Sequence, residues 1–437
     1  MPKSTFRKVL CAPGLLKEIR RCFDECEDSV ASRGITLTDC LMSGLAVFGL
    51  KYSSLLQFDQ DRNEERIRSN LQALYGVEKA PSDTYLRERL DLFNPDQFRR
   101  VYNRLIALLQ RGKGLERFNF LGDHYLLSLD GTGYFSSSKV HCKQCCEKHH
   151  RDGRTTYYHQ MLGAVLVHPE QREVIPFPPE PIIQQDGSNK NDCERNASKR
   201  LLRSLRREHP HMKLIVVEDG LASNGPHIQL LKELDLRFIL GAKQSDHTFL
   251  FDWVDNTSTT VTKEIVDDDG VIHRFRYLNE APLNETHFDL QVNFLEYWEI
   301  KPTGKTQHFS WVTDIAITTA NLMSLMQGGR ARWKVENETF NTLKNQGYHF
   351  EHNFGHGYQH LSTVMAHLMM LAFLVDQIQQ HCCPLFQDAQ RTAKRPRYFW
   401  QRLRSLFFDY LIPDWDTLYR GIAYGHKTTV LAPNDTS

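Results

Sequence analysis

The spacing of apolar residues divides the chain into a helical first part and a mixed second part. Residues 1–115 carry apolar side chains at intervals of three and four, as in FRRVYNRLIALLQ at 98–110, which predicts amphipathic helices. From residue 116 onward, short apolar runs alternate with helix-like stretches, which is typical of an α/β fold with a covered sheet. The first part is expected either to contact DNA or only to support the domain that follows.

Two apolar runs in the second part end on acidic residues. YLLSLD ends on Asp130, with glycines after it that let the chain turn, and KLIVVED ends on Glu218 and Asp219. Open α/β sheets place their ligand sites at the carboxyl ends of the strands. We therefore predict that Asp130 and Asp219 lie at one edge of the sheet, with Glu218 as an alternative to Asp219.

A helix is predicted over 330–346, because this stretch contains no Pro or Gly and a glycine follows it. Arg332, Glu336 and Lys344 recur at multiples of four residues and so share one face of that helix. Glu336 lies between two bases on this face, whereas Glu338 points elsewhere, where it can form a surface ion pair. Taken alone, the pattern also fits an ordinary amphipathic surface helix.

Three gathered carboxylates predict a metal site. They repel one another unless cations neutralise them, and such hard oxygen ligands suit Mg²⁺ or Mn²⁺. Two ions about 4 Å apart can activate a water or a 3′-hydroxyl and stabilise the leaving oxygen of a phosphodiester. Asp130, Asp219 and Glu336 therefore predict phosphoryl-transfer chemistry on DNA with two metal ions.

The remaining patterns complete the predicted domain organisation. Alternating apolar and polar residues predict an antiparallel β insertion, and the strand FSWVTDI after it is expected to rejoin the main sheet. A strongly apolar helix further along the chain is expected to be buried. The predicted order is a helical region at 1–115, the first part of the core at 116–246, the β insertion at 247–310, the second part of the core at 311–382, and a basic helical region at 383–437.

Several basic and aromatic residues are candidates for contacts with DNA. The segment 391–408, RTAKRPRYFWQRLRSLFF, interleaves cations with Tyr398, Phe399 and Trp400, which suits phosphates and base faces, although a solvated helix explains it as well. A Trp in the β insertion can stack on a displaced base or belong to the core. The candidate phosphate or DNA contacts are Arg332, Lys344, Lys243, Trp298, Arg395 and Arg397.

The run HCKQCCEKHH at 141–150 suggests a second, structural metal site. Cys142 and Cys145 have the CxxC spacing that lets two thiolates bind one Zn²⁺. We expect His150 as the third ligand and His141 or His159 as the fourth. The alternative is a loop of reduced cysteines and solvated histidines.

The composition limits the class of protein and its expected location but does not determine its function. The 437 residues are 41% hydrophobic, enough for a substantial core, and the net charge of +1 requires any basic surface to be local. Ten cysteines are too few for a disulfide scaffold. Because no apolar run approaches a membrane span and the start lacks the apolar core of a signal peptide, a cytosolic location is expected.

The three acidic motifs resemble those of the DDE transposases of bacterial insertion sequences, most closely the insertion sequence four group. The matching segments, within 120–375, are LSLDGTGYF with Asp130, VVEDGLASN with Asp219 and RWKVENETFNTLK with Glu336. The resemblance implies a ribonuclease-H-like catalytic domain interrupted by a β-rich insertion. Arg332 matches the signature around the glutamate. The chain departs from that signature at two positions, where Gly329 replaces a tyrosine and Leu343 replaces a lysine.

The resemblance also implies the partners and the location. The expected substrates are terminal inverted repeats, cut at the element ends, and target DNA, to which the 3′-hydroxyls are joined. A homodimer on the DNA and a bacterial, cytoplasmic location near the nucleoid are expected. The alternatives are a degenerate or domesticated protein that binds DNA without cutting it and a metal-dependent nuclease without joining activity.

Overall fold

The computed structural model describes residues 9–28, 30, 34–183 and 193–425, and they form two compact units. Unit 1 combines Met1–Gly114 with Thr342–Ser437, and unit 2 is Leu115–Asn341. The first division lies next to the predicted boundary at 115. The predicted boundary at 382 falls inside unit 1, because the helix that ends there packs with N-terminal helices.

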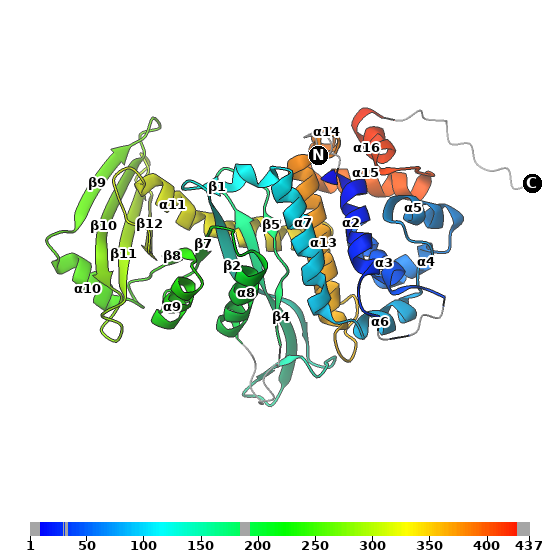
Figure 1. Cartoon of the computed structure of the whole chain (residues 1–437), viewed down its shortest axis with the longest axis horizontal. Helices are drawn as coiled ribbons and strands as arrows, with labels where there is room; N and C mark the ends of the chain where they lie inside the picture. Colours follow the sequence, from blue (N-terminus) through cyan, green and yellow to red (C-terminus); the bar gives the residue numbers. More distant parts are fainter. Residues whose placement is uncertain (1–8, 29, 31–33, 184–192, 426–437) are drawn as a thin grey trace, which may run out of the picture. The chain divides into compact units, whose positions relative to one another are not determined.

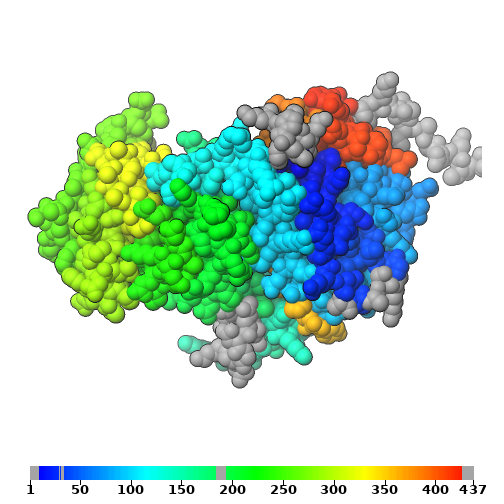
Figure 2. Space-filling model, viewed as in Figure 1, coloured from blue at the N-terminus to red at the C-terminus, as the bar shows by residue number. Residues whose placement is uncertain are grey.

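Over its described residues, unit 1 is built from helices, as the apolar spacing of 1–115 predicts (Figure 1). Helices α14, α15 and α16 pack against one another, and their orange and red atoms lie together in Figure 2. The helices are α2 (Ala12–Asp24), α3 (Leu37–Gly49), α4 (Leu55–Asp61), α5 (Glu65–Tyr75), α6 (Asp83–Asp91), η1 (Pro95–Gln97), α7 (Phe98–Arg111), α13 (Leu361–Cys382), α14 (Pro384–Ala393), α15 (Pro396–Asp409) and α16 (Trp415–Tyr424).

Helix α13 is the core element of unit 1. It packs against α2, α3, α6 and α7, and nearly all of its side chains are buried, as predicted. It is 22 residues long and apolar enough to cross a membrane by length and composition, but its most apolar stretch is entirely buried within the structure. The Asp91 carboxylate accepts hydrogen bonds from backbone N–H groups at 358–361 and so caps the helix start.

A buried ion pair lies beside α13 and corrects one prediction about the basic C-terminal segment. The Lys51 ammonium donates to Asp376 at 2.7 Å and lies 4.0 Å from the ring centre of Trp400. Burial lowers the pKa of Lys51, although Asp376 opposes this effect. Phe399 and Trp400 are both buried. The prediction that they contact DNA is therefore wrong, because their rings fill the core of unit 1.

Over its described residues, unit 2 is a mixed α/β structure built on one twelve-stranded sheet (Figure 1). The strand order is β3-β4-β2-β7-β8-β12-β11-β10-β9, with β1 beside β2 and with β5 and β6 beside β4. The strands are β1 (Asn119–Phe120), β2 (His124–Ser137), β3 (Cys146–His149), β4 (Thr155–Val167), β5 (Ile175–Pro176), β6 (Glu180–Ile182), β7 (Leu214–Glu218), β8 (Arg237–Gly241), β9 (Val261–Val266), β10 (Ile272–Pro282), β11 (Gln291–Ile300) and β12 (Thr306–Thr313).

The centre of this sheet is parallel and its two sides are antiparallel. Strand β7 runs parallel to both β2 and β8, whereas β4 runs antiparallel to β2 and β12 antiparallel to β8. The predicted antiparallel insertion is present as β9 to β12, and it continues the main sheet through β12. The helical segments within unit 2 are α8 (Glu194–Glu208), α9 (Gly225–Glu233), α10 (Thr248–Asn256), α11 (Leu322–Arg330), η3 (Ala331–Trp333) and η4 (Val335–Phe340). Two further segments, η2 (Gly114–Phe118) and α12 (Asn341–Asn345), cross the boundaries between the units.

Because His367 is buried, we expect the protein to lose stability in mild acid. Its imidazole stacks on Phe98 with ring centres 5.2 Å apart, and burial lowers its pKa to about 3. Below its ordinary pKa of about 6.5, the unfolded chain binds a proton that the native state does not. Above pH 6.5 His367 is neutral in both the folded and the unfolded chain, so its burial costs no stability there. As the pH drops toward 3, the free energy of unfolding should fall by up to about 1.4 kcal/mol per pH unit.

Urea denaturation of the wild type and of His367→Leu at several pH values between 7 and 5 tests this expectation. The variant should show a shallower dependence of the free energy of unfolding on pH. Exposed His211 supplies a matched control, and His211→Gln should keep the wild-type dependence. Equal pH dependence in the wild type and His367→Leu would contradict the assignment.

Candidate active site

Asp130 and Asp219 occupy neighbouring positions on two parallel strands. Strand β2 pairs with β7 up to Ser128, which lies opposite Val217. Two further residues along the same register bring Asp130 level with Asp219, which directly follows β7. The prediction that the first strand ends at Asp130 is wrong, because β2 continues to Ser137 by pairing with β4. The two aspartates nevertheless come together where β2 separates from β7.

The segment that carries Glu336 is not the regular helix that the sequence predicts. Helix α11 ends at Arg330, the short 3₁₀ segment η3 follows, and η4 is a π-helix with Glu336 in its first turn. Wider turns change which residues share a face, so Arg332, Glu336 and Lys344 do not form the predicted continuous row. π-helical turns are rare and often accompany functional sites.

One anchor ties the start of this segment to strand β2. The hydroxyl of Ser128, which is fully buried, donates to the carbonyl oxygen of Arg332 at 3.0 Å. Ser128 lies two residues before Asp130, so this hydrogen bond holds η3 against the strand that carries the first acid. The sequence pattern gives no sign of this contact, because its two partners are 204 residues apart.

A second anchor holds the end of the segment over strand β4. A Cβ atom on Gly163 would lie 3.0 Å from the ring of buried Phe340, so glycine leaves the room that this ring needs. Gly163 is also the residue that pairs with Asp130 across β2 and β4. Both ends of the segment are thus fixed around Asp130, and Glu336 lies between them on η4.

The charges of the three acids act on one another. Burial raises the pKa of Asp130, and the negative charges of Asp219 and Glu336 raise it further. Two contacts oppose this effect: Arg332 lies 3.9 Å from the Asp130 carboxylate, and the Gly131 N–H donates to it at 3.0 Å. The structure therefore brings the predicted acidic trio within electrostatic range in unit 2, and a bound cation would relieve its repulsion.

A fourth acid, Glu194, lies at the start of α8 and was not predicted from the sequence. Its carboxylate lies so close to strand β2 that a Cβ on Gly131 would come within 2.2 Å of it. Partial burial raises the pKa of Glu194, as do the charges of Asp130, Asp219 and Glu218. The only sequence signal was an acid in the first turn of an otherwise basic helix. Glu194 lines a cavity of about 250 Å³ together with Asp130, Glu218 and Asp219, whereas Glu336 is not among its lining residues.

Glu218 is engaged differently from Asp219. His227 Nε2 donates to Glu218 at 2.6 Å, and the Ser198 hydroxyl lies within hydrogen-bonding distance at 3.4 Å. Although burial lowers the pKa of His227, the charge and hydrogen bond of Glu218 raise it overall. Asp219 instead accepts from the N–H of Leu221 in the turn after β7. These contacts leave Asp219 as the better metal-ligand candidate of the pair.

Two predicted DNA contacts of unit 2 lie in different parts of the sheet. Exposed Lys243 follows β8, and its side chain lies against Gly220 in the turn after β7, close to the acids. Trp298 lies on β11 and is half-buried, with its ring stacked on His308 at a centroid distance of 5.0 Å. One face of the Trp298 ring is therefore already covered within the β insertion.

The other predicted contacts belong to unit 1. Lys344 pairs with Glu351 at 3.2 Å. Arg395 and Arg397 are exposed at the start of α15, where phosphates can reach them. None of these three residues is in the unit that carries the acidic trio.

The Cys/His run forms a separate cluster in unit 2. The structure brings Cys142, Cys145 and His159 together, with both sulfurs within 3.4 Å of His159 Nε2. The prediction that His150 belongs to this group is wrong. Its Nε2 lies 2.8 Å from the hydroxyl of Thr156, because the turn between β3 and β4 directs the ring along the hairpin.

Comparisons with known proteins add little to this geometry. No protein-family model matches the chain, and no curated protein matches it in sequence. A solved structure described as a piggyBac transposase synaptic complex with hairpin DNA is similar, with 9% sequence identity and a TM-score of 0.41 over 96% of this chain and 80% of that chain. A similarity at this TM-score and sequence identity does not establish the family or the function of this protein.

The Ser128 anchor yields a prediction about the acidic site. Ser128→Ala should lower the free energy of unfolding by about 1 kcal/mol, because the carbonyl oxygen of Arg332 loses its hydrogen bond. It should also weaken Mn²⁺ binding, since Glu336 loses one of its two supports. Urea denaturation and isothermal titration with Mn²⁺ measure the two effects. Ser136→Ala, an exposed change on the same strand, should leave both unchanged; equal effects of the two variants would contradict the anchoring role.

Proposed function

We propose that this chain is a DDE transposase that cuts the ends of an insertion sequence and joins them to target DNA. The observation that carries the proposal is that the charges of both Asp219 and Glu336 act on the Asp130 carboxylate in unit 2, although the three acids are spread over more than 200 residues of sequence. Asp130 and Asp219 are half-buried, and Glu336 is exposed. Carboxylates whose charges act on one another favour a hard divalent cation. The donor set is therefore suited to Mg²⁺ or Mn²⁺, two ions in this proposal.

Some residues of the site would bind the metal ions, and others would position the DNA phosphates. Asp130 and Asp219 would bind the ions from the sheet, and Glu336 would complete the set from η4. When bound, the ions would supply activation of the attacking hydroxyl and stabilisation of the leaving oxygen. Arg332, close to Asp130, would hold a phosphate beside the ions, and Lys243 would contact the DNA backbone near the turn after β7.

The wider assignment follows the motifs around the three acids. We assign the centre of unit 2 to a ribonuclease-H-like core and strands β9 to β12 to the β-rich insertion of the insertion sequence four group. The proposed partners are the terminal inverted repeats and target DNA, bound by a homodimer in the bacterial cytoplasm. Unit 1 would contribute phosphate contacts through Arg395, Arg397 and Lys344. Trp298 would contact a displaced base only if its ring moved away from His308.

Replacing Glu336 tests the proposed chemistry. The purified protein is incubated with Mg²⁺, a labelled duplex carrying the inverted repeats that flank its gene, and a supercoiled target plasmid. Glu336→Gln should reduce the rate of strand cleavage by at least about 100-fold, because the loss of a metal ligand removes several kcal/mol of transition-state stabilisation. Cleaved ends and joined products are separated on denaturing gels.

Glu338→Gln is a matched control for this substitution. Glu338 lies two residues further along η4 and faces Arg172 at 3.6 Å, so its loss should leave the cleavage rate within a few-fold of the wild type. Cleavage without joining would support the plain nuclease, and retarded migration without cleavage would support the DNA-binding protein. Full activity in Glu336→Gln would contradict the proposed site.

The choice between the adjacent acids Asp219 and Glu218 has its own test. Asp219→Asn should abolish cleavage while leaving the unfolding transition nearly unchanged, because its carboxylate bonds only the turn in the described contacts. Glu218→Gln should instead lower stability by about 1 to 3 kcal/mol, because a buried hydrogen-bonded charge is lost beside His227. Cleavage assays and urea denaturation of both variants measure this contrast, and the reverse pattern would assign the ligand to Glu218.

A further inference from the structure

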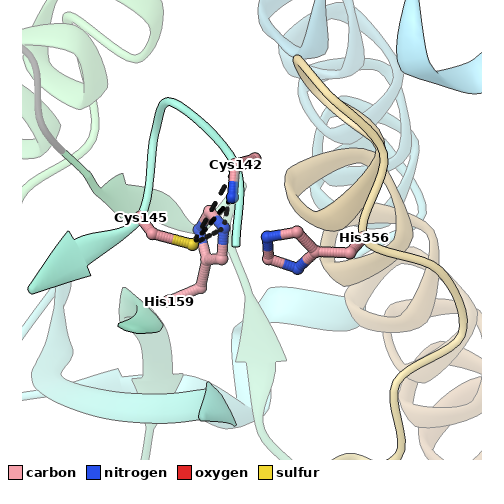
Figure 3. A group of neighbouring side chains, drawn as sticks. All are labelled: Cys142, Cys145, His159 and His356. Carbon is pink, nitrogen blue, oxygen red and sulfur yellow. Dashed lines mark hydrogen bonds between the residues drawn. The ribbon is translucent and has the colours of Figure 1, made fainter. Parts of the chain in front are cut away.

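The Cys/His cluster of unit 2 lies outside the acidic site and has the geometry of a metal centre. Figure 3 shows Cys142, Cys145 and His159 next to one another, and their potential ligand atoms lie within 4.8 Å of one another. The figure also draws His356, which belongs to unit 1 and is not counted among these ligands. We propose that Cys142, Cys145 and His159 bind one structural Zn²⁺.

The distances within the cluster match those of a tetrahedral zinc site. The two sulfurs lie 3.9 Å apart, and His159 Nε2 lies 3.3 Å from the sulfur of Cys142 and 3.4 Å from that of Cys145. Tetrahedral bonds of about 2.3 Å to sulfur and 2.0 Å to nitrogen would place the sulfurs ~3.8 Å apart and each sulfur ~3.5 Å from the nitrogen. A disulfide would need sulfurs at ~2.05 Å, so the pair is not poised as one.

The local backbone selects these ligands from the surrounding cysteines and histidines. A turn places the Cys145 N–H on the Cys142 carbonyl, which brings the two sulfurs to the same side. Cys146 begins β3, and its sulfur faces the carbonyl of Ile182 instead. Successive strand residues point to opposite faces, so only one of the two adjacent cysteines can join the cluster.

The histidine of the cluster is fixed by the sheet. His159 is fully buried on β4 opposite Phe135, and its ring stacks beside Tyr134 at a centroid distance of 5.9 Å. Its Nε2 is thereby held toward the sulfurs before any ion binds. His141 is directed elsewhere, because its ring stacks on Tyr157 at 4.3 Å. The fourth zinc position is left to a donor outside this trio.

The position of the cluster indicates a structural role. It joins the loop before β3 to β4, whose partner strand β2 carries Asp130. His159 lies only four residues from Gly163, the neighbour of Asp130 on β4. A bound ion would therefore fasten the far end of the hairpin that carries the first acid, without touching the DNA chemistry itself.

Zinc content and affinity test the proposal without any DNA. Protein purified from zinc-supplemented medium should contain about one Zn²⁺ per chain by atomic emission. Zinc-free wild-type protein should take the ion back from a chromogenic chelator with an apparent Kd at or below about 100 nM. Cys145→Ser and His159→Gln should each weaken this binding by at least about 100-fold. Less than a tenth of an ion per chain, together with no uptake, would overturn the proposal.

Two neighbouring substitutions are matched controls. Cys146→Ser and His150→Ala change the adjacent cysteine and the histidine that the sequence favoured, and both should keep wild-type zinc affinity. Loss of binding in either control to the same extent as in Cys145→Ser would refute this ligand set. Because these titrations are carried out without DNA and with Mg²⁺ in excess, a failure of the zinc site and a failure of the cleavage site give separate results.

Trypsin digestion tests the structural role in the wild-type protein. Arg151 and Arg154 are exposed in the turn between β3 and β4, where trypsin can cut. Removal of zinc by a chelator should speed cleavage at these two positions by about tenfold or more, and added Zn²⁺ should restore the slow rate. Equal rates with and without zinc would show that the ion does not fasten the hairpin.

Discussion

Electrostatic repulsion among carboxylates is the constraint on which the organisation of unit 2 depends. Asp130, Glu194, Glu218 and Asp219 line one cavity, and the charge of Glu336 also acts on Asp130. Such groups separate unless the fold holds them in place or cations neutralise them. Two contacts serve the first purpose: a hydrogen bond from the Ser128 hydroxyl and the packing of the Phe340 ring on Gly163 fix the segment that carries Glu336.

These supports show why parts of the site could be predicted from the sequence and others could not. Asp130 and Asp219 follow from apolar runs that end on acids, because strand burial is a local pattern. The π-helical turn at Glu336 could not be predicted, since the contacts that accompany it join residues far apart in the chain. Glu194 was missed for the same reason: its proximity to Gly131 arises from tertiary packing and leaves no periodic signal.

The Cys/His cluster and the basic C-terminal segment show the same limit. The CxxC spacing correctly drew attention to Cys142 and Cys145, but the third residue depends on which histidine the hairpin turns inward. Strand pairing selects His159, whereas His150 lies in the turn. In unit 1, the interleaved aromatics at 398–400 looked like a DNA surface, yet Phe399 and Trp400 are core residues. A local pattern does not reveal which side of a helix other helices cover.

Strand β4 connects the two candidate metal sites of unit 2. It contributes Gly163 beside Asp130 and His159 to the cysteine cluster. The geometry of the acidic site therefore depends on the order of this hairpin as well as on the anchors of η4. An anomalous diffraction map of crystals soaked in Mn²⁺ tests the central claim most directly. The account predicts manganese peaks coordinated by the carboxylates of Asp130, Asp219 and Glu336 together; peaks that lack Glu336, or that lie away from these residues, would contradict it.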